Sequence, residues 1–222
     1  MPMTKKSILG LILSGLLIMC VGCSGAPAGN GSSDDCATGQ DLKPVIYLYP
    51  EEDNTAVSVR LDYNGDLTEL IPEFNAENVW NCTANKNGKI TFEGKDYDYL
   101  FWEGAPKWEY DFYSGFCIRG ADTEAFLKEA LPQLGLNESE AKEFMEFWVP
   151  QMQGNAYNMI SFQGRTYNKN AKLTVTPEPD SIIRVFMAWY PTERFIKINP
   201  QYLSAPERKG FTVVEWGGNK VK

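Results

Sequence analysis

The sequence of 222 residues contains no histidine. This absence excludes Ser-His-Asp and Cys-His catalysis, HExxH zinc sites and histidine-based pH switching, because each depends on an imidazole group. Basic residues are the minority, with 21 Lys and Arg against 29 Asp and Glu and a formal net charge of −8. A nucleic-acid partner is not expected, because phosphate groups are bound by Lys and Arg. No metal-ligand set has a suitable spacing, and no cofactor is predicted.

Three functional motifs are present only as fragments. An EF-hand spacing that begins at Asp62 has Leu67 where the loop requires glycine. An SxxK sequence, Ser139 to Lys142, lacks the partner motifs of serine-lysine enzymes. The segment GFCIRG around Cys117 lacks the spacing of a nucleophile elbow and has no histidine base. Each fragment has a simpler structural explanation. The first is a hairpin turn, Ser139 and Lys142 lie on the solvated face of a helix, and Cys117 is a small core residue or half of a disulfide.

The N-terminal sequence predicts that the domain is located outside the cytoplasm. Lys5 and Lys6 precede a mostly apolar run of fourteen residues, Ile8 to Val21, which is too short for a comfortable membrane span. The run ends in CVGC, which resembles the lipobox of bacterial lipoprotein signal peptides, with Cys23 as the lipid acceptor. We therefore expect removal of residues 1–22 and attachment to the membrane through Cys23. An uncleaved anchor and a plain secreted protein are the alternatives.

The chain changes character near Lys43. Residues 23–42 comprise the lipidated cysteine and a segment rich in Gly, Ser, Ala and Asp, which predicts a flexible tether. The segment VIYLY then has no polar face and lies between Pro44 and Pro50, so we expect a strand that is covered on both sides. Residues 43–222 are predicted to form a single β-rich domain.

Turn and capping signals organise this domain. Asn64-Gly65 predicts a hairpin with Val59 opposite Leu70. The NKNG segment, with Gly88 in a left-handed conformation, predicts a second hairpin that aligns Ala84 with Ile90. Two helices are expected between Asp122 and Gly154, with the second stopped near Pro150. An N-cap begins the first helix, a capping box begins the second and a glycine separates them, so together they form an αα-hairpin. With about ten strands around them, the predicted fold class is α+β, mainly antiparallel β in a sandwich or strongly curved sheet.

The segment 96–113 is the densest cluster of acidic and aromatic residues. Glu103, Glu109 and Asp111 are the candidate carboxylates for glycoside hydrolysis, which needs two carboxyl groups across a cleft. Trp102 and Trp108 are the candidate rings for sugar binding. The alternative is a hairpin whose rings fill the core while its acids face water.

The cysteine count predicts one disulfide. Beyond Cys23, the mature chain retains Cys36, Cys82 and Cys117. Because Cys36 lies in the tether, the expected pair is Cys82–Cys117.

Several blocks of sequence, running from Lys43 to Gly218, are similar to a family of bacterial secreted and surface proteins of uncharacterised function. They include KPVIYLYP, YLFWEG, TPEPDSIIRVFMAWYP and ERKGFTVVEWGG. The resemblance implies one intact extracytoplasmic domain and supplies no activity, cofactor or functional residue. The expected function is therefore a lipid-anchored, non-enzymatic binding or structural domain at the cell surface, with an envelope glycan or protein as its partner. A carboxylate-based glycan hydrolase is the alternative.

Overall fold

The computed structural model describes residues 39–221. The predicted signal peptide 1–22, the predicted lipidation site Cys23 and the cysteine Cys36 lie outside this range. The described chain forms a seven-stranded and a five-stranded sheet. In spatial order the larger sheet contains β3 (Gly65–Ile71), β7 (Leu100–Pro106), β1 (Asp41–Tyr49), β12 (Thr212–Lys220), β11 (Ser181–Thr192), β9 (Tyr157–Gln163) and β8 (Phe116–Arg119). The smaller sheet contains β10 (Ala171–Thr176), β2 (Thr55–Tyr63), β4 (Val79–Ala84), β5 (Ile90–Phe92) and β6 (Lys95–Tyr97).

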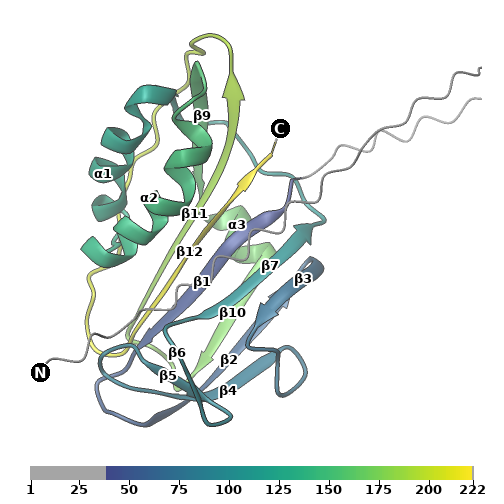
Figure 1. Cartoon of the computed structure of the whole chain (residues 1–222), viewed down its shortest axis with the longest axis vertical. Helices are drawn as coiled ribbons and strands as arrows, with labels where there is room; N and C mark the ends of the chain where they lie inside the picture. The colour runs from purple at the N-terminus through teal and green to yellow at the C-terminus, as the bar shows by residue number, and fades with distance from the viewer. Residues whose placement is uncertain (1–38, 222) are drawn as a thin grey trace, which may run out of the picture. The chain divides into compact units, whose positions relative to one another are not determined.

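The seven-stranded sheet is the middle layer of the domain. Helices α1 (Thr123–Gln133) and α2 (Glu138–Met152) cover one of its faces, and the five-stranded sheet packs on part of the other (Figure 1). A third, short helix, α3 (Arg165–Asn170), precedes β10. The predicted class, α+β with mostly antiparallel strands and a short helix pair, is confirmed. Among the strand pairs of residues 39–221, one departs from the antiparallel pattern, because β11 and β12 run parallel.

The segment VIYLY of β1 has no polar face because a hydrophobic core lies on each side of the strand. Side chains alternate across a strand, so Val45 and Tyr47 enter the core beneath the helices, whereas Ile46 and Leu48 enter the core between the two sheets. The strand begins at Asp41, ahead of Pro44. An irregularity in register between Leu42 and Val45 accommodates this proline inside a central strand.

The helical hairpin is confirmed by its packing and its caps. In α2, the Asn137 side chain accepts a hydrogen bond from the Glu140 N–H at 2.9 Å, and the Glu140 carboxylate accepts one from the Asn137 N–H at 2.9 Å. Gly135 adopts a φ of +92° after α1, a conformation that glycine tolerates without strain. The helix α2 continues past Pro150 to Met152 and buries Trp148 completely.

The predicted hairpin at Asn64-Gly65 is wrong, because β2 and β3 belong to different sheets. Val59 lies opposite Val175 and Trp80 within the smaller sheet. The main chain of Asn64 explains the separation: its N–H donates to Asn170 at 2.7 Å and its carbonyl accepts from Lys107 at 3.0 Å. Both groups are thus bonded to other segments when the chain passes from one sheet to the other.

The second predicted hairpin is confirmed. Ala84 lies opposite Ile90, and Gly88 has a φ of +83°. This register directs Ile90 and Phe92 into the core between the sheets.

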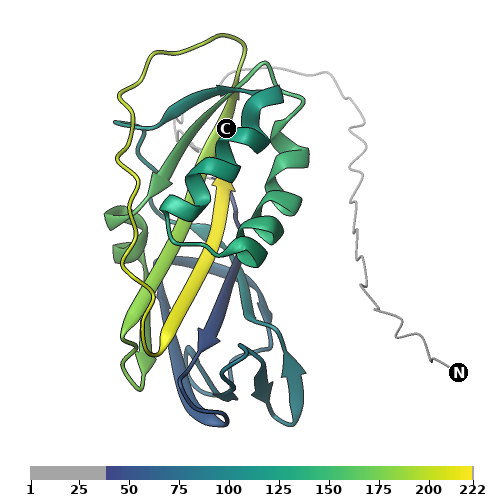
Figure 2. The ribbon, with the colours of Figure 1, turned by 90° about the vertical axis from the view of Figure 1, so that its left-hand side faces the viewer.

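A long connection, residues 193–211, joins the parallel strands β11 and β12, and we call it the strap. Figure 2 shows the strap, in yellow-green, running along one side of the larger sheet. The Gln201 side chain fastens it to β9 by accepting from the Phe162 N–H at 2.8 Å and donating to the Phe162 carbonyl at 2.9 Å. Two residues before Gln201, the Asn199 carbonyl accepts from the Gly115 N–H at 2.8 Å.

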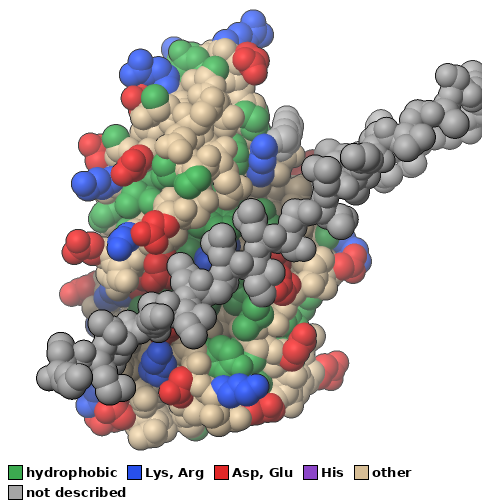
Figure 3. All heavy atoms as spheres, in the orientation of Figure 1, with side chains coloured by type: hydrophobic (Ala, Val, Ile, Leu, Met, Phe, Trp, Pro, Cys, Tyr) green, Lys and Arg blue, Asp and Glu red, His purple; other side chains and the backbone are tan. Residues whose placement is uncertain are grey.

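The surface carries charged side chains of both signs and a few exposed aromatic rings. Acidic and basic side chains are interspersed on the face shown in Figure 3. Phe195 and Tyr202 of the strap are 60% and 92% exposed, and Tyr113 is 87% exposed. Within residues 39–221, no helix combines the length and the apolar character that crossing a membrane requires.

Candidate functional site

The predicted acidic and aromatic cluster is divided by the larger sheet. Trp102 is fully buried between the two sheets, where its indole N–H donates to a Glu215 carboxylate oxygen at 3.2 Å. Glu103, the next residue of β7, projects from the opposite face. It accepts a hydrogen bond from the Lys43 N–H at 3.2 Å, and partial burial raises its pKa. A ligand cannot stack on Trp102, since this ring has no open face.

The remaining members of the cluster lie in different environments. Trp108 is half-buried in the core between the sheets, edge-on to Tyr63 with ring centroids 5.2 Å apart. Glu109 is exposed. Asp111 is half-buried, and its main-chain carbonyl accepts from the Gln163 side chain at 2.9 Å. The two tryptophans therefore pack in the core between the sheets, while each of the three carboxylates has its own surroundings.

The predicted disulfide is not formed. Cys82 and Cys117 are free thiols. Cys82 is buried on β4 of the smaller sheet, whereas Cys117 is half-buried on β8 at the edge of the larger sheet. The two cysteines belong to different sheets, whereas a disulfide requires the two Cα atoms to lie within about 7 Å. Burial raises the pKa of the Cys82 thiol to about 11.

A buried polar network surrounds the first residue of β1. The Asp41 carboxylate accepts hydrogen bonds from the Tyr63 hydroxyl at 2.7 Å, the Tyr110 hydroxyl at 2.5 Å and the Asn219 amide at 2.8 Å. Burial raises the pKa of Asp41 to about 6, and the nearby Glu215 carboxylate adds to this rise. The network ties β1 to β2, β12 and the segment before β8, which gives it a structural role.

A second buried pair lies beside this network. Arg184 on β11 donates to Glu215 on β12 at 2.6 Å, and both side chains are almost completely buried. The Arg184 guanidinium also lies 4.8 Å from the ring centroid of Tyr167 on α3. Burial, together with the nearby Glu215 carboxylate, holds the pKa of Tyr167 well above its ordinary value. These contacts fix α3 against the larger sheet.

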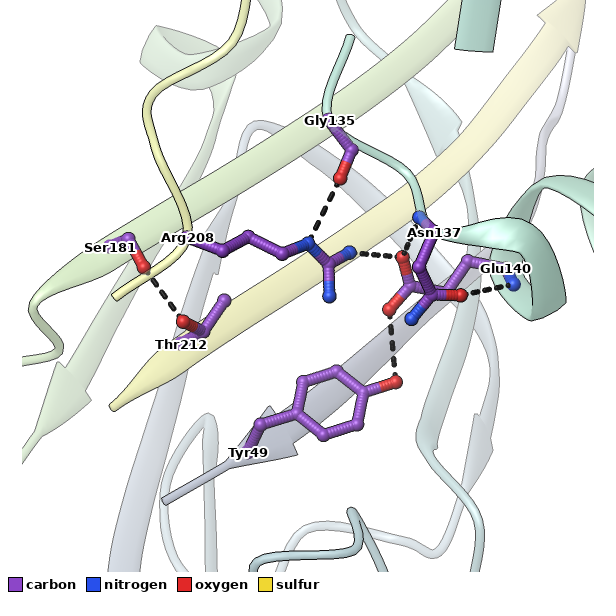
Figure 4. Close-up of polar contacts among 7 residues, drawn as sticks. All are labelled: Tyr49, Gly135, Asn137, Glu140, Ser181, Arg208 and Thr212. Carbon is purple, nitrogen blue, oxygen red and sulfur yellow. Dashed lines mark hydrogen bonds and ion pairs between the residues drawn. The ribbon is translucent and has the colours of Figure 1, made fainter. Parts of the chain in front are cut away.

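The tyrosines of the KPVIYLYP block contact carboxylates of α2. Figure 4 shows Glu140 accepting from the Tyr49 hydroxyl at 2.9 Å and pairing with the Arg208 guanidinium of the strap. Arg208 also donates to the Gly135 carbonyl at 3.0 Å. One turn along α2, Glu143 accepts from the Tyr47 hydroxyl at 2.7 Å. This cluster closes the strap onto the helical hairpin, and burial raises the pKa of both tyrosines above the ordinary range.

A pocket of about 420 Å³ lies between the β3–β4 connection and the β5–β6 hairpin, and we call it the β5–β6 pocket. Phe74 packs against Trp80, with ring centroids 4.4 Å apart. Tyr97 is half-buried and meets the edge of the buried Phe92 at 6.4 Å. Aromatic side chains therefore line the pocket from both segments. Its lining residues are Pro72, Glu73, Phe74, Phe92, Glu93, Lys95 and Tyr97.

Charged side chains complete this pocket. Glu73, Glu93 and Lys95 are all exposed. Glu93 and Gly94 have φ values of +49° and +77°, the consecutive left-handed conformations of a type I′ turn. Asn, Asp and Gly favour these positions, so a glutamate there carries a conformational cost. The turn holds the Glu93 side chain at the pocket.

Sequence reasoning missed the β5–β6 pocket, although it included Tyr97 in its aromatic cluster. The pocket residues come from two segments about twenty residues apart (Pro72 to Phe74 and Phe92 to Tyr97), and only the folded sheet brings them together. The sequence Glu93-Gly94 between two short strands was the available signal. Among residues 39–221, no group of three or more Cys, Asp and Glu residues is arranged to hold a metal ion.

The fold and the site define a two-sheet α+β domain with an aromatic and charged surface pocket. The chain is 63% identical over 102 residues to a Butyrivibrio fibrisolvens protein described as "Uncharacterized protein in bglA 3'region". The match covers 46% of this chain and 99% of that protein, so the chain belongs to the family of this bacterial protein. No family model matches the sequence. No solved structure matches it.

Proposed function

We propose that this chain is a lipid-anchored, extracytoplasmic binding protein of a bacterial envelope and that its ligand is a glycan held in the β5–β6 pocket. The observation that carries the proposal is the composition of this pocket, in which Phe74 and Tyr97 lie beside Glu73, Glu93 and Lys95. The volume of about 420 Å³ is within the range of small-ligand sites.

A sugar unit matches this lining in two ways. The C–H faces of a sugar ring pack against aromatic side chains such as Tyr97. The sugar hydroxyls need hydrogen-bond acceptors and donors, which the carboxylates and Lys95 supply. Because Glu73 and Glu93 are exposed at the pocket, they can bind hydroxyls without first losing a structural partner in the core.

The N-terminal sequence supports the location. The lipobox-like CVGC sequence predicts a lipid on Cys23, and the Gly- and Ser-rich segment after it has the composition of a flexible linker. A domain tethered in this way can reach glycans of the envelope while the lipid holds it at the membrane.

One observation favours a second candidate, a carboxylate-based glycan hydrolase. Glu73 and Glu93 come from different segments and line the same pocket. Hydrolysis would require these two carboxyl groups to lie roughly 5–10 Å apart across the scissile bond. Analysis of the glycan after incubation distinguishes the two functions, because binding leaves the glycan intact and hydrolysis releases fragments.

Co-sedimentation of the whole protein with purified peptidoglycan, alongside titration with soluble envelope polysaccharide, tests the proposal. Glu93→Gln should weaken binding by about tenfold, the value of one hydrogen bond to a charged group. Tyr97→Ala should weaken binding at least as much. Glu109→Gln is the matched control, because it removes an exposed carboxylate outside the pocket.

Two results would contradict this function. Unchanged binding in both pocket variants would show that the β5–β6 pocket does not bind the glycan. Sugar fragments that are released by wild type and disappear with Glu93→Gln would show hydrolysis in place of simple binding.

A further inference from the structure

The strand β8 is an edge of the seven-stranded sheet within residues 39–221 and pairs with β9 alone. The Gly120 N–H donates to the Ala156 carbonyl at 3.3 Å, on the β9 side. Main-chain groups alternate in direction along an antiparallel strand, so Ile118 also faces β9. The N–H and C=O groups of Cys117 and Arg119 consequently point away from the sheet.

A groove of about 460 Å³ lies along this edge at Cys117 and Arg119. Just before β8 the strap already occupies the edge, because the Asn199 carbonyl accepts from the Gly115 N–H at 2.8 Å. The strand β8 and the helix α1 line one part of the groove, and Tyr157 and Phe195 line the other. Phe195 is 60% exposed, and its ring centroid lies 6.2 Å from that of Tyr157. The groove therefore offers main-chain hydrogen-bonding groups next to apolar contact surface.

The charge in the groove is negative. Arg119 is neutralised by Asp122, since their side chains are 2.7 Å apart. Glu129 also lines the groove and is exposed. Within the described part of the chain, no ion pair of Glu129 is formed. A basic side chain is the electrostatic complement of this carboxylate.

We propose that the β8 edge binds an extended segment of a partner protein, which adds a strand to the larger sheet and places a basic side chain beside Glu129. An extended peptide satisfies outward N–H and C=O groups in one line, and its alternate side chains enter pockets beside the edge. A helical ligand would leave the edge groups of β8 unpaired, because its own main chain is already hydrogen-bonded internally.

This interaction is independent of the proposed glycan site. The strand β8 pairs with the first residues of β9, which lie near the top of the larger sheet in Figure 1. The strands β5 and β6 lie at the bottom. Both ligands can therefore be bound at once.

Proline offers a specific test at Arg119. Its φ of −60° already matches the φ of proline. Arg119→Pro removes one outward N–H and leaves the ladder to β9 intact, as proline on an edge strand can do. Arg119→Ala is the matched control, since it also loses the guanidinium but keeps the N–H. Glu129→Lys tests the charge without changing the main chain.

The whole protein is first used to select peptides from a phage-displayed library of random heptapeptides. We expect enriched sequences that alternate β-branched residues with Lys or Arg. Their binding should fall at least tenfold with Arg119→Pro and with Glu129→Lys, and should change less than threefold with Arg119→Ala. Melting temperatures of the variants establish that each is folded.

Three outcomes would overturn the proposal. The first is the absence of enriched peptides. The second is equal binding of the enriched peptides to Arg119→Pro and Arg119→Ala. The third is a dimer of the chain that Arg119→Pro dissociates, because the occupant of the edge would then be a second copy.

Discussion

Replacing Asp41 by asparagine should remove a pH-dependent penalty from the stability of the fold. The carboxyl group of Asp41 is fully buried and bound by two tyrosine hydroxyls and the Asn219 amide. Desolvation by this burial raises its pKa from 3.8 to about 6. Asparagine keeps the size and an acceptor oxygen at this position but cannot ionise.

The magnitude follows from the change in pKa. A tenfold change in a protonation equilibrium is worth about 1.4 kcal/mol, so a pKa that moves from 3.8 to about 6 corresponds to about 3 kcal/mol. Between these pH values the folded protein binds more protons than the unfolded chain, and stability therefore falls as the pH rises. Below pH 3.8 the penalty is absent, and above pH 6 it is complete.

Urea unfolding followed by tryptophan fluorescence, at pH values on both sides of this window, is the assay. The free energy of unfolding of Asp41→Asn, taken relative to wild type, should rise by about 3 kcal/mol between low and neutral pH. This difference is insensitive to any constant effect of the substitution on the hydrogen bonds. Asp66→Asn is the control, because the Asp66 side chain is exposed. A relative change below about 1 kcal/mol would refute the buried-carboxyl account.

Three further predictions concern the core, the anchor and the thiols. Trp148→Ala should lower the free energy of unfolding by ~3–5 kcal/mol, because this ring of α2 is fully buried in the core and a cavity would remain; an unchanged urea midpoint would contradict this packing. Metabolic labelling with a palmitate analogue should mark wild type but not Cys23→Ala, and label that survives the substitution would disprove the anchor. Alkylation of the folded protein should modify Cys117 before Cys82, since Cys82 is buried and its pKa is raised to about 11; a peptide map that links the two would contradict the free thiols.

Local signals in the sequence predicted the helical hairpin well. The capping box of Asn137 and Glu140 and the glycine that ends α1 act within a few residues, so their effect does not depend on the rest of the fold. The same holds for the turn at Gly88 and for the apolar segment of β1 that begins at Val45. These elements were found because each pattern has one favoured backbone conformation.

Non-local contacts decided what the sequence could not predict. The Asn64-Gly65 dipeptide suits a tight hairpin, yet the two flanking strands belong to different sheets. The Asn64 N–H donates to the Asn170 carbonyl, and the Asn64 carbonyl accepts from the Lys107 N–H. The buried role of Asp41 was hidden because its three partners lie far away along the chain. The surroundings of the candidate site residues were hidden for a related reason, since the segment 96–113 passes from β6 of the smaller sheet through β7 of the larger sheet into a loop.

The most direct test of the proposed function is a structure of the protein with an envelope oligosaccharide bound. We expect a sugar ring in the β5–β6 pocket, packed against Tyr97, with a hydroxyl donating to Glu93 and the glycosidic bonds intact. A sugar bound elsewhere on the domain would contradict the central claim. A cleaved product between Glu73 and Glu93 would show that the protein hydrolyses the glycan.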